Sequence, residues 1–433
     1  MSERARGRHL RVLHVLNASS GGAAVSLVEL LRAAHRDDAA TEHYVIYPGG
    51  DNEWAQAIER AAIDTRVAPL RTWHKQRYPS PWLHAASMLR EAASSGFGLR
   101  SLRETSSAAR EWDVDLVATN CSINIDGALA ARRLGLPHVW HIRERIGEDG
   151  SIQFRQQMPE VCTRLGQLAD AFAVVSKYAA EPLFRNGLAD KVRIVHDGVD
   201  CSRFAEVQAQ QGARALRGQW GVRPGELVVG KVANVTATLK RHEVFVQAAG
   251  IVARQRSNVR FVVIGALPGE RPMQRDSLRY YEKLRAMAAE MGLADRLVWA
   301  GDLPEPASFM AALDIVAHAC EMEAFPRVVL EAMAAGRAVV GPASGGFAEG
   351  VGDSGAGVLV EPLSAEALAA SLRDLLDHGE RRQAAGAAGQ RRAREAFDIH
   401  AHRRVLAQTY ADVLSQRRRG HEPVAAGYVR DAT

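Results

Sequence analysis

The chain has few cysteines and no long apolar run. Its four cysteines (Cys121, Cys162, Cys201 and Cys320) are scattered over 433 residues without the C-x-x-C spacing of a zinc site. They predict reduced core residues of a cytosolic protein and not a disulfide framework. No run of 18 apolar residues is present, and the polar start of the chain lacks the apolar core of a signal peptide. We therefore expect a cytoplasmic protein with no helix that spans a membrane.

A strong charge of one sign is also lacking. The formal net charge is only +5, which gives no indication of a nucleic-acid partner. With 47% apolar and 24% charged residues the composition is that of a globular protein, and 433 residues exceed what one core organises. We expect two domains, residues 1–204 and 205–399, followed by a helix and tail at 400–433.

A dinucleotide fingerprint is absent from the places where it would function. The glycine-rich loop at residues 17–23, with Gly21 and Gly22, does not read G-x-G-x-x-G. Residues 350–355 match that string, but they follow a predicted helix and precede a predicted strand, the reverse of the required order. NAD-type cofactors are therefore not expected.

Apolar strand patterns alternate with amphipathic helix patterns along the whole chain. The strand patterns lie at residues 10–16, 43–48, 65–69, 115–120, 137–144, 171–177 and 192–200, then at 227–234, 259–265 and 296–301, and from 315, 338 and 357. This alternation predicts the α/β class, with two doubly wound parallel sheets and right-handed crossovers.

Residues 323–336 carry the most informative motif of the second domain. They read as a loop that becomes a helix, with Pro326 in the first turn and Gly336 at the end. The helix opens after a strand, where its N-terminus and Arg327 suit a phosphate. Glu323 and Glu331, eight residues apart, suit the hydroxyl groups of a ribose or a sugar. A capped helix with two solvated glutamates is the alternative.

Two further stretches leave alternatives open. His141, Arg143 and Glu144 end the strand pattern at 137–144, where polar groups serve either a ligand or the structure. Residues 70–107 mix basic and aromatic side chains. This mixture suits weak peripheral contact with anionic lipid at the inner membrane face, or a helical excursion whose aromatic residues pack inward.

The stretch at 323–336, followed by Gly345, Gly346 and Glu349, resembles the E-x7-E signature of retaining glycosyltransferases of family 4. Residues 137–144 resemble the family's acceptor-side strand, and 192–204 its passage between domains. The resemblance covers about residues 10–415. It implies the GT-B fold, two Rossmann-like domains facing each other across a cleft, with the last helix packed back on the first domain.

The resemblance also implies site residues. It places the catalytic groups at Lys240, on the donor diphosphate, at Glu323, facing the transferred sugar, and at His141, lining that sugar. Arg143 and Glu144 lie on the acceptor side. The donor-binding positions are Gly21, Gly22, Asn234, Arg241, Gly301, Phe325, Pro326, Arg327, Val328 and Glu331.

Some of these positions have a specific part in the family. Glu331 would hold the ribose, Gly301 the nucleobase, and the backbone at 325–328 the phosphates. Asn234 departs from the arginine that the family has there, so we expect Arg241 or Arg327 to compensate.

The expected activity is retaining hexosyl transfer from a nucleoside-diphosphate sugar to a sugar, lipid-linked or small-molecule hydroxyl acceptor, in polysaccharide or glycoconjugate synthesis. Members of the family are assigned a front-face mechanism, which needs no metal and no cofactor. Two alternatives are a nucleotide-sugar epimerase of the same architecture and a non-catalytic scaffold.

Overall fold

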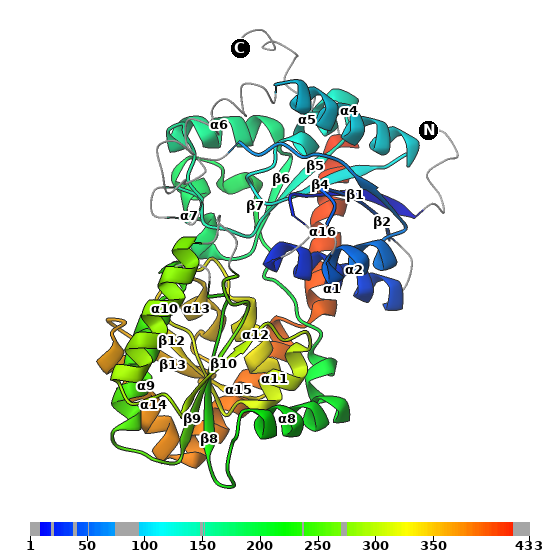
Figure 1. Cartoon of the computed structure of the whole chain (residues 1–433). Coiled ribbons are helices and arrows are strands. Elements are labelled where there is room, and N and C mark those ends of the chain that lie inside the picture. The colour runs from blue at the N-terminus through cyan, green and yellow to red at the C-terminus, as the bar shows by residue number, and fades with distance from the viewer. Residues whose placement is uncertain are drawn as a thin grey trace. The chain divides into compact units, whose positions relative to one another are not determined.

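A computed structural model describes residues 9–18, 21–37, 41–50, 52–73, 95–147, 150, 152–235, 238–269 and 275–418. The chain divides into two compact units (Figure 1). The first comprises Met1–Gly198 and His402–Thr433, and the second is the continuous stretch Val199–Ala401. Residues 74–94, which hold much of the basic and aromatic stretch, lie outside the described residues.

The first unit contains a seven-stranded sheet in the order β3-β2-β1-β4-β5-β6-β7, and all its strand pairs are parallel. Its strands are β1 Leu10–Leu16, β2 Thr41–Tyr47, β3 Asp64–Val67, β4 Leu116–Asn120, β5 His138–Ile142, β6 Ala171–Val174 and β7 Val192–Ile194. Its helices are α1 Gly22–Asp37, α2 Glu53–Ala61, α4 Ser95–Glu111, α5 Asp126–Leu134, α6 Met158–Leu168, α7 Lys177–Arg185 and η2 Ala189–Lys191, with most of α16 Ile399–Arg418.

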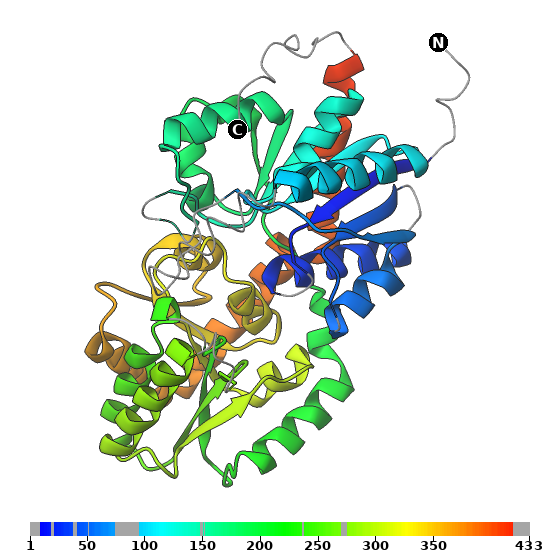
Figure 2. The same ribbon diagram turned by 45° about the horizontal axis from the view of Figure 1, so that its top comes forward.

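Alternating side chains of the first sheet enter two cores because successive residues of a strand point to opposite faces. Val12 and Leu16 of β1 pack under α1 and α2, where Leu406, Tyr410 and Val413 of α16 complete the core. Leu13 and Val15 face the other way, toward α4 and α5. Figure 2 shows α4 in cyan on the side of this sheet opposite the blue helices α1 and α2.

The second unit repeats the design with a six-stranded parallel sheet in the order β10-β9-β8-β11-β12-β13. Its strands are β8 Leu227–Val232, β9 Val259–Ile264, β10 Leu297–Gly301, β11 Ile315–Ala317, β12 Ala338–Pro342 and β13 Gly357–Val360. Its helices are η3 Cys201–Ala205, α8 Val207–Gln219, η4 Thr238–Lys240, α9 His242–Ala253, α10 Arg275–Glu290, α11 Pro306–Ala312, α12 Arg327–Ala334, α13 Gly345–Val351, α14 Ala365–Asp377 and α15 Gly379–Ala396.

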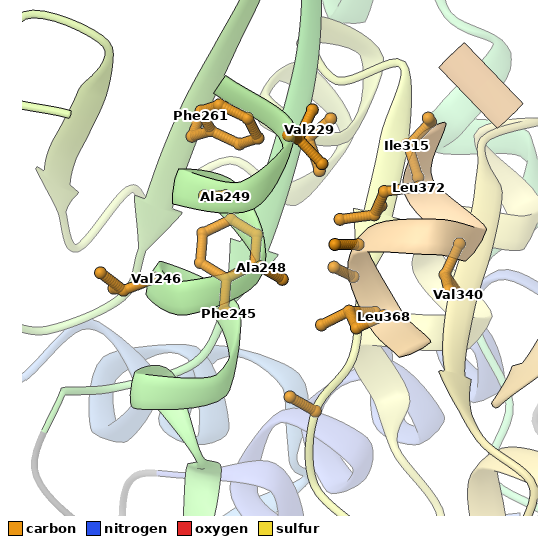
Figure 3. Close-up of a cluster of buried hydrophobic side chains, with 14 of the residues drawn as sticks. Val229, Phe245, Val246, Ala248, Ala249, Phe261, Ile315, Val340, Leu368 and Leu372 are labelled. Atoms are coloured by element: carbon orange, nitrogen blue, oxygen red, sulfur yellow. The ribbon is translucent and has the colours of Figure 1, made fainter. Parts of the chain in front are cut away.

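One face of this second sheet carries a large apolar core. Phe245 of α9 and Leu368 and Leu372 of α14 point toward strand residues such as Val229 and Ile315 (Figure 3). All five side chains are fully buried. Packing of this kind fixes the strand ends, and therefore the loops that follow them.

The structure confirms the predicted α/β class and the two doubly wound sheets. The prediction that Pro326 lies in the first turn of the helix was wrong, because Pro326 is the N-cap residue that precedes α12. Its ψ of 105° is extended, so helical geometry begins only at Arg327. Among the described residues no helix is long and apolar enough to cross a membrane.

Candidate functional site

The candidate site lies where the strand order of the second sheet reverses, between β8 and β11. Crossovers leave in opposite directions at such a point, and the loops beyond the strand ends separate to admit a ligand. Lys231 is on β8, Asn234 and Lys240 follow it, and His318 directly follows β11. This single edge therefore gathers charged groups from distant parts of the chain.

The loop after β11 is held by backbone contacts on both sides. The His318 N–H donates to the carbonyl of Val340 at 2.7 Å, and the Gly346 N–H donates to the carbonyl of Glu323 at 2.9 Å. A Cβ at position 346 would lie 2.1 Å from the Ala324 carbonyl oxygen, so only glycine permits this approach. Gly346 therefore serves to position the backbone of Glu323.

The two expected catalytic groups of this unit are in contact. Nζ of Lys240 lies 2.9 Å from Oε1 of Glu323, and both side chains are partly exposed, at 35% and 25%. Oε2 of the same carboxylate lies 3.4 Å from Nε2 of His318. The partly exposed side of the Lys240–Glu323 pair can reach a ligand, whereas Oε2 of Glu323 faces the buried His318 ring.

The charges of this cluster are set by burial and by one another. Burial raises the pKa of Glu323, but neighbouring His318, Lys240 and Lys231 outweigh burial and hold that pKa below its usual value. Burial lowers the pKa of His318 to about 4, so the ring is neutral at pH 7. Burial also lowers the pKa of Lys231 to about 8.

Lys240 remains a full cation. Burial lowers its pKa, but the Glu323 carboxylate more than offsets burial and raises it. At neutral pH the cluster therefore presents one carboxylate between two ammonium groups. Such an arrangement suits a ligand that carries both hydroxyl groups and negative charge.

The helix that follows carries its own ion pair. Nη2 of Arg327 lies 3.4 Å from Oε1 of Glu331, one helical turn later, and both side chains are about nine-tenths buried. Val328 beside them is half-buried, whereas Pro326 is buried. Phe325 is buried as well, with its ring 5.4 Å from that of Phe397. Phe325 and Pro326 therefore contribute backbone to the site, and not exposed side chains.

Asn234 has a structural part that its sequence position did not reveal. Its side-chain carbonyl oxygen accepts a hydrogen bond from the Ala266 N–H at 3.0 Å, which joins the loops after β8 and β9. Gly301 ends β10 with φ of 70°, and its carbonyl accepts from the Gly265 N–H at 2.9 Å. The three strand exits are thus linked along one edge.

Arg241, expected to compensate for the missing arginine, is engaged by carboxylates. Its Nη1 lies 3.0 Å from Glu321 and its Nε lies 3.1 Å from Glu243. Its φ of 49° turns the chain sharply before α9. Its charge is thus balanced by two carboxylates of the protein, as that of Lys240 is balanced by Glu323.

The first unit contains the remaining predicted residues. His141 is buried, its Nε2 lies 2.9 Å from the hydroxyl oxygen of Tyr410, and its ring lies 6.2 Å from that of His14. Burial holds the pKa of His141 well below its usual value, with Arg143 adding to the effect. The ring is therefore a neutral, packed group, and its predicted contact with the sugar stays a prediction.

Arg143 and Glu144 are likewise held within their own unit. Arg143 forms a buried ion pair with Asp197, which also accepts a hydrogen bond from Ser26 of α1 at 3.1 Å. Oε2 of Glu144 accepts from the Arg143 N–H at 3.0 Å. These contacts link the start of α1 to the end of β5.

Gly21 and Gly22 form the open start of α1. Gly21 has φ of 83°, and a Cβ on either glycine would meet no atom within 4 Å. Both residues are exposed. The backbone there is accessible, as a donor-binding turn requires.

Sequence reasoning missed four residues of these clusters. Lys231 gave a signal, because a lysine inside an apolar strand is unusual, and it is only 2% exposed. His318 and Cys320 lie beside a strand pattern that was interpreted only as core. Asp197 gave no local signal, since its partners lie 54 and 171 positions away.

Each of the two units matches a glycosyltransferase family model. The family model described as Glycosyltransferase Family 4 matches residues 20–203, and the one described as Glycosyl transferases group 1 matches residues 213–392. Among solved structures, Anabaena HepE in complex with UDP-glucose has a TM-score of 0.75 at 20% identity, over 93% of this chain and all of that one. At that identity the likeness shows the fold alone.

Two curated relatives are similar to part of the chain. The D-inositol 3-phosphate glycosyltransferase of Segniliparus rotundus is 31% identical over 275 residues, which cover 61% of this chain and 58% of that protein. The GDP-mannose-dependent alpha-(1-6)-phosphatidylinositol monomannoside mannosyltransferase of Mycolicibacterium smegmatis is 26% identical over 270 residues, 60% and 65% of the two chains. The chain spans about three fifths of the length of these relatives.

Proposed function

Because the chain belongs to family 4 of the glycosyltransferases, which has the GT-B fold, we propose that it transfers a sugar from a nucleoside-diphosphate sugar to a hydroxyl acceptor. The observation that carries this proposal is the Lys240–Glu323 pair at the switch point of the second sheet. It combines a cation for a diphosphate with a carboxylate for sugar hydroxyls. The Arg327–Glu331 pair lies in the helix that follows Glu323.

The transfer is proposed to retain the anomeric configuration. The bond from the anomeric carbon to the diphosphate oxygen breaks, and the bond to the acceptor oxygen forms on the same face. The acceptor proton passes to the departing phosphate oxygen. Preorganised cations aimed at the developing charge are the largest catalytic contribution in such reactions, and Lys240 has that part here.

The carboxylates then bind and orient the donor. Glu323 stays ionised because His318, Lys240 and Lys231 together lower its pKa against the effect of burial, so it can accept hydrogen bonds from the transferred sugar. Glu331, whose other partner is Arg327, accepts from the ribose hydroxyls. Because Lys240 and the start of α12 supply the positive charge, the reaction is proposed to need no metal ion.

The acceptor is proposed to be a polyol or a glycosylated lipid used in cell-surface glycoconjugates. The two relatives are named for an inositol phosphate and for a phosphatidylinositol mannoside, both of which offer ring hydroxyls near a phosphate. The protein would meet a lipid-linked acceptor at the inner membrane face, through the basic and aromatic residues near position 71 and beyond.

A panel of UDP- and GDP-sugars tests the proposal. We expect one donor to raise the melting temperature, and its nucleoside diphosphate to be released faster when inositol phosphates or mannosides are added. Nuclear magnetic resonance of the product reports whether the anomeric configuration is retained. Conversion of the donor to an isomer without an acceptor would favour the epimerase alternative, and absence of donor binding would favour a scaffold.

A further inference from the structure

Three side chains that commonly bind metal ions meet beside the proposed catalytic pair. His318, Cys320 and Glu323 each offer one ligand atom, and these atoms all lie within 4.8 Å of one another. A tetrahedral zinc ion with bonds of about 2.0–2.3 Å holds its ligands about 3.3–3.8 Å apart, so side-chain shifts of about 1 Å complete the geometry. The separation of 3.4 Å between His318 and Glu323 already falls in that range.

Two of these atoms are buried without a hydrogen-bond partner among the described residues: Nε2 of His318 and Oε2 of Glu323. The His318 ring is only 5% exposed and has a hydrogen bond with the backbone of Cys320. Since Nε2 has no partner, that bond uses Nδ1. An imidazole whose Nδ1 is engaged by the backbone leaves Nε2 available to a metal ion, as in many metal-binding histidines.

We propose that His318, Cys320 and Glu323 bind a zinc-like divalent cation, and that the bound ion inhibits sugar transfer. An imidazole, a thiolate and a carboxylate form a donor set that zinc accepts, and a fourth position is left for water. The ion can enter along the partly exposed edge of Glu323 and Lys240. The thiol of Cys320 loses its proton to the solvent as the ion binds.

Inhibition follows from what the ion does to Glu323. A carboxylate bonded to a metal no longer accepts freely from sugar hydroxyls, and the ion adds positive charge beside Lys240. This part rests on the proposed function, whereas the binding does not.

The two lysines oppose a cation and limit the affinity. Lys240 lies 2.9 Å from Glu323, and Lys231 is buried close enough to interact with Glu323 and Cys320, so both add positive charge beside the three ligands. We therefore expect a dissociation constant on the order of 1 μM, about 8 kcal/mol, below the ~10–16 kcal/mol of structural zinc sites.

Cobalt(II), which takes the same ligands, tests the binding directly. We expect one ion per chain, the ultraviolet band of a thiolate-bound cobalt ion, and its loss when zinc is added. Cys320→Ser and His318→Gln should each weaken binding about tenfold or more, and Cys320→Ser should remove the band. Cys201→Ser, at another buried thiol of the same unit, should leave both unchanged. A wild-type band that survives in Cys320→Ser, or no binding to the folded wild type, would overturn the site.

The inhibition has a separate readout. Saturating zinc should lower the wild-type transfer rate at least tenfold, and a chelator should restore it. Cys320→Ser should keep its own zinc-free rate at the same zinc concentration. Zinc that binds at this site without lowering the rate would overturn the inhibition. Cobalt binding by a protein that transfers no sugar would uphold the site and reject the proposed function.

Discussion

Lys240 is the residue whose removal most directly tests the proposed chemistry. Its ammonium group lies beside Glu323 and stays charged, and the charge of the leaving diphosphate grows in the transition state. Lys240→Ala should lower kcat about 10²–10³-fold, as loss of one such donor does. Steady-state kinetics over a range of donor concentrations measure this change. Lys283→Ala, an exposed lysine on α10, is the matched control and should leave kcat unchanged. A Lys240→Ala protein with normal kcat would remove this residue from the mechanism.

Glu331 should affect binding and not the chemical step, because ribose does not change during the reaction. Glu331→Gln keeps the shape but loses the charge that faces Arg327 and that we propose to bind the ribose. The donor KM should rise about tenfold, since a hydrogen bond to a charged group contributes ~1.5–3 kcal/mol, while kcat stays near normal. Glu395→Gln, exposed on α15, controls for the loss of a carboxylate. Normal KM and kcat in folded Glu331→Gln would contradict the ribose assignment.

For single residues, the sequence predicts which side chains belong to the site better than it predicts what those side chains contact. The motif at 323–336 and the family resemblance that it carries selected Glu323 and Lys240, and the structure brings them within 2.9 Å. His141 was expected at a ligand-facing strand end, yet its ring packs on Tyr410, 269 positions away. Such a contact depends on how distant segments pack, which local pattern does not encode.

The loop and helix around Glu323 depend on one glycine. Gly346→Ala would place a methyl group against the Ala324 carbonyl and push the 323–325 loop away from α13. We expect the unfolding free energy to fall by about 1–3 kcal/mol, as overpacking does, and kcat/KM to fall further because Glu323 moves. Denaturant unfolding and donor kinetics on the same preparation separate the two effects.

Gly218→Ala is the control for this change. Gly218 lies in α8, where a Cβ meets nothing within 4 Å, so alanine should be neutral or stabilising by up to about 1 kcal/mol. Full activity and stability in Gly346→Ala would show that the loop does not need this close contact.

Most helices and strands could be predicted because the local pattern of apolar and polar residues in each one specifies its type. Apolar runs located the buried central strands of both sheets, since a parallel strand that is covered on both sides buries both faces, whereas the edge strand β3 is polar and partly exposed. The start of α12 was wrong by one residue, because proline fits either the cap or the first turn and only the ψ of Pro326 decides. Lys231 was missed as a charged group because the apolar run around it dominates the pattern.

Buried histidines make the whole molecule sensitive to acid. Burial lowers the pKa of His43 and of His138 to about 4, below the ~6.5 of an unfolded chain. The unfolded state therefore binds more protons between these values. Stability is fully present above pH 6.5 and falls as the pH drops toward 4. Each histidine should account for a loss of about 2 kcal/mol at pH 5.

Denaturant titrations at pH 7.5 and pH 5 measure this loss. His43→Gln should reduce it. Equal unfolding free energies at the two pH values would show that these rings titrate normally in the folded protein.

The first unit is built from both ends of the chain. A chain that stops at Ala401 loses Leu406, Tyr410 and Val413 from the core under α1 and α2. Three buried side chains at ~1.5–3 kcal/mol each approach the ~5–15 kcal/mol stability of a typical domain. This truncation should unfold the first unit and leave the second intact, so calorimetry should show a single transition, that of the second unit. A chain that ends at Arg418 keeps α16 and should retain both transitions.

The discontinuous first unit gives synthesis on the ribosome a fixed order. All seven strands of that unit emerge early, yet the helix that covers one of their faces is the last described element to be made. The second unit, a continuous stretch, has all its residues before α16 is complete. A product of interrupted translation therefore carries both sheets but leaves Val139 and Ala171 without their cover. That exposed apolar face marks an unfinished chain for proteases, and only a chain translated through α16 conceals it.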